Sequence, residues 1–167
     1  TPLYSSAASD VYKRQEQAGA YNFFLSDDEL AFYLWSGSGA SQNVTTSTNS
    51  ITTGVWQHVA MTFDDTTNDV YFYVNGVEIA SDLSTITNDF TGTSHPFNIG
   101  WSGQGTEHFD GGMRDVRFYK HVLSADQIAS LYSGSYNVTP VHWWKLDDNT
   151  GATGAVEDYG TGTDADG

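Results

Sequence analysis

VWQHVAMTFDDTTNDVYFYVNGVEIAS, residues 55–81, is the stretch of sequence that decides the fold. Its Asn75-Gly76 dipeptide accepts positive φ at both positions of a two-residue type I′ turn, and apolar alternating runs flank it on both sides. The turn predicts a β-hairpin and sets its register. The expected cross-strand pairs are Val74 with Val77, Tyr73 with Glu78, Phe72 with Ile79, and Tyr71 with Ala80.

Alternation assigns the side chains of this stretch to two faces, because successive residues of a strand point to opposite sides. Valine, phenylalanine and isoleucine fall on one face, which we expect to be core. Residues 55–63 alternate in the same way, and the DDTTND cluster at 64–69 is typical of a turn. The sequence therefore predicts a three-stranded antiparallel meander. The expected core face of the hairpin consists of Val70, Phe72, Val74, Val77 and Ile79, and the opposite face of Tyr71, Tyr73, Glu78 and Ala80.

Most of the remaining regular segments also have strand character. A hairpin is expected from 21–25 and 30–35, and further strands are expected at 43–46, 96–101, 109–119 and 141–146. One helix is predicted over 125–132, because Ser124 and Gln127 have the spacing of a capping box and Gly134 follows as a stop signal. We expect this helix to lie against the sheets. The predicted fold class is all-β, an antiparallel two-sheet jelly-roll sandwich with one short C-terminal helix.

Composition excludes several classes of function. The chain has 167 residues, no cysteine and a formal net charge of −15, from 21 acidic and 6 basic residues. Such a charge repels phosphate backbones and anionic membranes, so neither nucleic-acid binding nor membrane insertion is expected. No run of about 20 apolar residues is present. Few charged residues, abundant Gly, Ser, Thr and Asn, and 14% aromatics are typical of an exported β protein.

Four blocks of sequence resemble one family in the right order. They are WQHVAMTF at 56–63, YVNG at 73–76, FDG with DVRFY between 109 and 119, and LSADQI at 123–128. These blocks closely resemble laminin-G-like jelly rolls of the concanavalin A-like lectin and glucanase superfamily. The resemblance covers about 21–134 and implies a domain that lacks its first strands. Residues 141–167 resemble these missing first strands, so we expect a second, similar domain to start there.

The expected organisation has four parts: a leader at 1–19, a sandwich at 20–134, a linker at 135–140 and the second start at 141–167. Residues 10–15, DVYKRQ, resemble a translated sequencing-adapter tail, so the leader is predicted to be non-native or disordered. The apolar VHWWKL at 141–146 is of the type that covers an open edge. We expect it to pack onto the first domain, in its own chain or in a neighbour.

Catalysis is not expected. The superfamily that this chain resembles includes enzymes that cleave glucans. These enzymes carry Glu-x-Asp-x-x-Glu on a strand, because retaining glycoside hydrolysis needs two carboxyl groups about 5 Å apart. That motif is absent. Each glutamate lies in a different segment, namely Glu16, Glu29, Glu78, Glu107 and Glu157.

The resemblance also implies a possible calcium ion held by aspartate side chains and loop carbonyls, the hard oxygen ligands that this cation prefers. The predicted ligands are Asp110, Asp147 and Asp158, with Asp148 and Asn149 beside them. The alternative is that these residues only make turns. Asp115 and Arg117 are expected to form a structural pair.

Glycan binding is the functional hypothesis, because sugars dock on aromatic faces while polar side chains complete their hydrogen bonds. Trp101, Gln104 and His108 lie in one glycine-rich connection, and Tyr71 and Tyr73 offer a second aromatic surface. The alternatives are a core position for Trp101 and a buried second sheet face for the tyrosines. The family resemblance implies that Trp56 belongs to the core.

The sequence thus predicts a non-catalytic extracellular module of a multidomain surface or secreted protein. Its expected partners are glycans or cell-surface proteins, and neighbouring similar domains in the same polypeptide. The alternatives are a spacer or protein-interaction repeat without a sugar ligand, and a fragment of a glycoside hydrolase.

Overall fold

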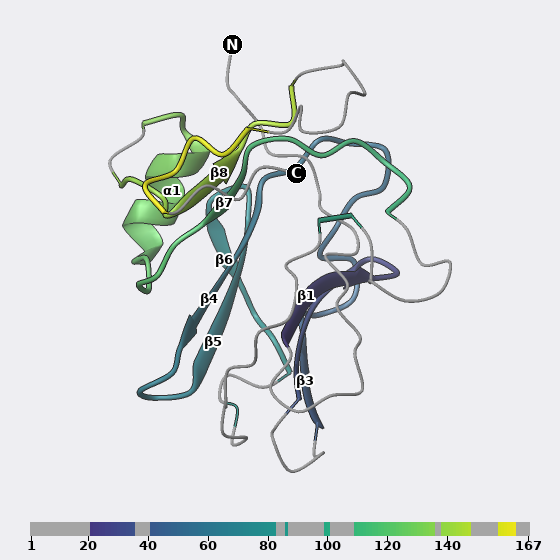
Figure 1. Cartoon of the computed structure of the whole chain (residues 1–167). Coiled ribbons are helices and arrows are strands. Elements are labelled where there is room, and N and C mark those ends of the chain that lie inside the picture. The colour runs from purple at the N-terminus through teal and green to yellow at the C-terminus, as the bar shows by residue number, and fades with distance from the viewer. Residues whose placement is uncertain are drawn as a thin grey trace.

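Strands dominate the part of the chain that the structure, a computed structural model, describes (Figure 1). The described residues are 21–35, 41–82, 86, 99–100, 109–135, 138–147 and 157–162. The strand predicted at 96–101 falls almost wholly outside them. The elements are β1 (Tyr21–Ser26), β2 (Glu29–Trp35), β3 (Ser41–Thr45), β4 (Val59–Asp64), β5 (Asp69–Val74), β6 (Val77–Ile79), β7 (Val116–Phe118), α1 (Ala125–Tyr132) and β8 (His142–Trp144).

The first sheet has the order β1-β2-β3, and both of its strand pairs are antiparallel. A tight turn joins β1 to β2, with Ser26 opposite Glu29 and Asp27 at φ 55°. Short polar residues such as aspartate tolerate this left-handed conformation better than most others. The predicted hairpin is confirmed, and β3 begins two residues before the strand predicted at 43–46.

The second sheet, β4-β5-β6, is the meander predicted from residues 55–81. Asn75 and Gly76 both have positive φ, 52° and 78°, as a type I′ turn requires. Three of the predicted pairs are confirmed, from Val74 opposite Val77 to Phe72 opposite Ile79. The fourth, Tyr71 with Ala80, lies beyond β6. The first strand starts at Val59 rather than at residue 55.

The two sheets pack against each other around one core (Figure 1). Aromatic rings meet across it, with 5.6 Å between the centroids of Phe32 and Phe63 and 6.2 Å between those of Phe23 and Phe72. Burial of each large apolar side chain contributes about 1.5–3 kcal/mol. Val70 and Phe72 lie in the core as predicted, whereas Val77, at the end of the same face, is exposed. The buried cluster consists of Leu30, Phe32, Leu34, Val44, Ile51, Val70, Phe72 and Ile86.

The two sheets are also joined at one edge. Thr46, directly after β3, forms a β-bridge with Ser81, and the N–H of Asp82 donates to the carbonyl of Thr45 at 2.8 Å. The buried Thr46 hydroxyl accepts a hydrogen bond from the N–H of Leu30 at 2.9 Å. This edge fixes the position of one sheet relative to the other.

Helix α1 has the predicted bounds and the predicted capping box, in which Ser124 and Gln127 bond each other's backbone N–H. Its apolar face packs on the outer face of the second sheet. The helix also lies close to the β5–β6 turn, where a Cβ on Gly76 would be 3.1 Å from Cα of Ala129. Gly76 is therefore needed both for the turn and for helix packing. The second buried cluster consists of Tyr73, Leu123, Ile128 and Leu131.

Strands β7 and β8 form a two-stranded antiparallel sheet. Strand β7 is shorter than the run predicted at 109–119, because Asp115 adopts φ 56° and interrupts the extended backbone. The predicted packing of 141–146 onto the first domain is confirmed within the same chain, with Val116 opposite Trp144. The helix found in the described residues is too short to cross a membrane.

Candidate ligand-binding site

The structure separates the two tyrosines that the sequence assigned to one aromatic surface. Tyr71 is 38% exposed on the outer face of β5, whereas Tyr73 is 3% exposed and packs under α1. Burial raises the pKa of the Tyr73 phenol above its ordinary value. Tyr73 therefore belongs to the buried second face of the sheet, and Tyr71 alone remains available to a ligand.

The other predicted sugar-binding residues, Trp101, Gln104 and His108, lie outside the described residues. They remain predictions from the sequence.

Trp56 is a candidate for ligand contact, and the prediction that it lies in the core is wrong. It was expected in the core, but its side chain is 49% exposed, and Val55 beside it is exposed as well. Gln57 turns inward instead and accepts a hydrogen bond from the N–H of Thr52 at 2.7 Å through Oε1. Since neighbouring residues in extended backbone point to opposite sides, the inward Gln57 leaves Trp56 pointing outward.

The exposed indole is held by residues that follow the glycine bend. The guanidinium carbon of Arg114 lies 4.9 Å from the ring centroid of Trp56, within the range of a cation–π contact. Gly112 lies against the ring as well, since a Cβ there would be 2.8 Å from Cη2 of the indole. Asp110, in the same segment, is exposed. Gly112 and Arg114 thus contact a half-exposed aromatic ring.

The aspartates predicted to bind calcium do not form a ligand set in the described residues. Asp110 and Asp147 are exposed, and Asp148 and Asn149 lie outside the described residues. Nowhere in the described ranges do three or more His, Cys, Asp or Glu side chains come together in a way that could hold a metal. Calcium binding remains a prediction.

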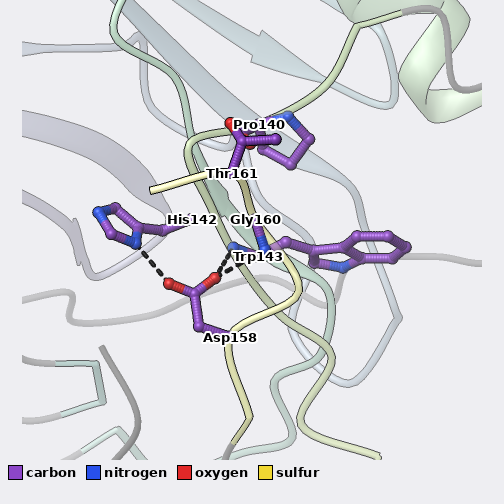
Figure 2. Close-up of polar contacts among 6 residues, drawn as sticks. All are labelled: Pro140, His142, Trp143, Asp158, Gly160 and Thr161. Atoms are coloured by element: carbon purple, nitrogen blue, oxygen red, sulfur yellow. Dashed lines mark hydrogen bonds and ion pairs between the residues drawn. The ribbon is translucent and has the colours of Figure 1, made fainter. Parts of the chain in front are cut away.

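Asp158 has a structural role in a clasp that we define as residues 157–162 together with β8 (Figure 2). Its side chain is 2% exposed. Oδ1 accepts from the N–H groups of Trp143 at 2.9 Å and Gly160 at 2.8 Å, while Oδ2 pairs with Nδ1 of His142. Burial acts to raise the pKa of Asp158, but these hydrogen bonds and the His142 charge outweigh it, so the pKa is lowered. Both oxygens are engaged within the protein.

A second polar cluster is formed by residues of β7 and β8 and their neighbours, and its Arg117 and Asp115 side chains are largely buried. Asp115 accepts from Arg117 at 3.4 Å, as predicted, and also from the indole Nε1 of Trp143 at 3.1 Å. The Arg117 guanidinium lies 4.6 Å from the Trp143 centroid, and the Lys145 ammonium 3.7 Å from that of Tyr159. These cations pack on the rings of Trp143 and Tyr159, so the two rings are partly occupied by the protein itself.

His58 is a partly buried titratable group next to β4 and α1. Its ring lies 5.9 Å from that of Tyr132, and its Nδ1 is buried with no hydrogen-bond partner in the described structure. Burial, and to a smaller extent the nearby Arg117 charge, lower the pKa of His58 to about 4. The imidazole is therefore neutral at pH 7 and acts as a packed side chain.

The family to which the sequence is matched agrees with the fold. A family sequence model described as the concanavalin A-like lectin/glucanases superfamily matches residues 2–129. The chain is 28% identical over 109 residues to adhesion G-protein coupled receptor V1 of Danio rerio, an alignment that covers 62% of this chain and 2% of the receptor. Among solved structures it is similar to an S-layer domain-containing protein of Clostridium thermocellum, with 21% identity, a TM-score of 0.36, and coverage of 80% of this chain and 63% of that one.

Proposed function

The chain belongs to the concanavalin A-like lectin/glucanases superfamily, and from this membership we propose that it is a non-catalytic, extracellular carbohydrate-binding module that serves in adhesion. The family match over residues 2–129 is the observation that carries the proposal. It confirms the laminin-G-like resemblance found in the sequence. Truncation of the domain and a second copy at 141–167 remain predictions.

The fold supports a binding role because it holds exposed aromatic side chains on a rigid scaffold. Trp56 and Tyr71 are both accessible, and each is carried by a segment next to the packed core. Aromatic rings supply large contact area at low entropic cost, and loops on a rigid sandwich are common places for ligand contacts. The similar Danio rerio protein is named an adhesion receptor, and this similarity supports a cell-surface or secreted location for this chain.

The proposal excludes a hydrolase because the sequence lacks the paired acidic motif. Retaining cleavage requires two carboxyl groups about 5 Å apart, and the five glutamates are spread over five segments of the sequence. Activity on laminarin or xylan would contradict this part of the proposal.

A spacer without a sugar ligand is the second candidate. The alignment covers 62% of this chain but only 2% of the receptor, as expected for one small module in a very long polypeptide. In that role the domain would contribute length and neighbouring-domain contacts rather than recognition.

A glycan array screened with and without EDTA tests both candidates. Saturable binding to any glycan supports recognition. Thermal unfolding that depends on calcium, without binding to any glycan, supports the spacer. Binding that is unchanged by EDTA would argue against a calcium-dependent site.

A further inference from the structure

We infer that Trp56 is the stacking platform of a subsite for a neutral sugar, and that Arg114 stands at its border. The inference rests on the proposed carbohydrate-binding function and gives it a location and a ligand class. It assigns this role to a residue that the sequence analysis placed in the core.

The first argument is that the indole is exposed and held in place at the same time. Its side chain is 49% exposed, yet Arg114 lies 4.9 Å from its centroid and Gly112 lies directly against its six-membered ring. A ring whose rotamer is already restricted loses little freedom when a ligand binds. Gly112 leaves room for this position of the indole, because a Cβ there would force the tip of the ring to shift.

The second argument is the chemical character of the surroundings. The exposed part of the indole is apolar, which suits the C–H face of a pyranose ring. The guanidinium group of Arg114, next to the ring, adds a polar and charged border. An apolar ring bordered by a few polar groups is the usual composition of a small-ligand site.

The third argument concerns charge and selects neutral over sulfated sugars. The chain carries a formal net charge of −15 with 21 acidic and 6 basic residues. A field of this sign repels polyanions and slows their association. A single arginine next to the indole does not compensate for that excess.

Another exposed aromatic residue, Tyr159, fits the role less well and provides the control. It is 46% exposed, and its cation lies closer to the ring: the Lys145 ammonium is 3.7 Å from the Tyr159 centroid, whereas the Arg114 guanidinium carbon is 4.9 Å from that of Trp56. Because Tyr159 and Trp56 are both exposed rings next to a cation, replacing Tyr159 is a matched control for the loss of such a ring.

The test measures binding of the full chain to immobilised laminarin, xylan and galactomannan as neutral probes and to heparin as a sulfated probe. The variants are Trp56→Ala, Trp56→Phe, Gly112→Ala and Tyr159→Ala, each checked for unaltered thermal unfolding. We expect Trp56→Ala and Gly112→Ala to weaken binding to the neutral probe at least about tenfold, as for other central aromatic contacts. Trp56→Phe should recover part of this loss, and Tyr159→Ala should leave binding within about twofold of the parent.

Each outcome has a distinct meaning. Neutral-probe binding that survives Trp56→Ala overturns the inference but leaves the proposed function intact, and directs attention to Trp101, Gln104 and His108. Preferential binding to heparin overturns the ligand class. Failure of the parent chain to bind any of the four probes, or any glycan of an array, refutes the proposed function and this inference with it.

Discussion

Acidification should destabilise this domain through His58, at pH values where most carboxylates stay charged. The pKa of His58 is lowered from 6.5 to about 4, so between these values the unfolded chain binds a proton that the folded chain excludes. Stability therefore rises with pH in this window and is lost as the pH falls through it. The slope approaches about 1.4 kcal/mol per pH unit.

The size of the effect follows from the two pKa values. Integration of proton binding between pH 7.5 and 4.5 gives a loss of about 2.5 kcal/mol in the free energy of unfolding from His58 alone. This is a substantial part of the 5–15 kcal/mol that is typical of a folded domain. The residue is only partly buried, so solvent screening reduces this value.

Urea unfolding followed by tryptophan fluorescence at pH 7.5, 6.5, 5.5 and 4.5 would measure this loss, with His58→Leu as the comparison. Because Nδ1 has no hydrogen-bond partner in the described structure, the apolar replacement should change stability at pH 7.5 by no more than about 1 kcal/mol. The variant should lose the steep part of the profile. Other titrating groups contribute equally to both proteins and cancel in the difference. Parallel pH profiles of the two proteins would refute the argument that His58 is partly buried and neutral.

Three further predictions concern the clasp, the turn and the core. Asp158→Asn should speed amide hydrogen exchange in 142–144 and 157–162. In the parent chain this protection should persist above the ordinary aspartate pKa of 3.8 and disappear as the pH falls through the lowered pKa of Asp158. Gly76→Ala should destabilise the domain more than Gly54→Ala by urea unfolding, since both glycines have similar positive φ but only Gly76 has helix atoms at 3.1 Å; equal losses would contradict the packing argument. Phe72→Ala should cost about 3–5 kcal/mol by the same assay and Val77→Ala less than about 1 kcal/mol, because only Phe72 is buried; similar costs would contradict the assigned core.

Features encoded by adjacent residues were predictable from the sequence. The Asn75-Gly76 turn sets the register of β5 and β6 because its conformation depends on those two residues alone. The limits of α1 follow for the same reason, since Ser124 and Gln127 satisfy the first N–H groups of the helix locally. The family resemblance then extended this local information to the whole sandwich.

Features that depend on long-range packing were not predictable. Alternation correctly placed Tyr71 and Tyr73 on one face, but it could not show that α1 covers Tyr73 and leaves Tyr71 exposed. The prediction that Trp56 is buried was wrong, because the sequence does not reveal how far along a strand other elements cover the sheet face. The donors around Asp158 include the backbone of Trp143, 15 residues away, and no sequence pattern marks such a contact.

The clasp has a mechanical consequence. Force applied along the chain at residue 162 would reach the hydrogen bonds of Asp158 and the contact between Thr161 and Pro140 before it reached the β7–β8 pairs. Stretching should therefore release 157–162 first, at low load, and lengthen the tether by a few residues while the sandwich stays intact. Extension would therefore begin outside the core, and the packed sheets would keep their length at that load.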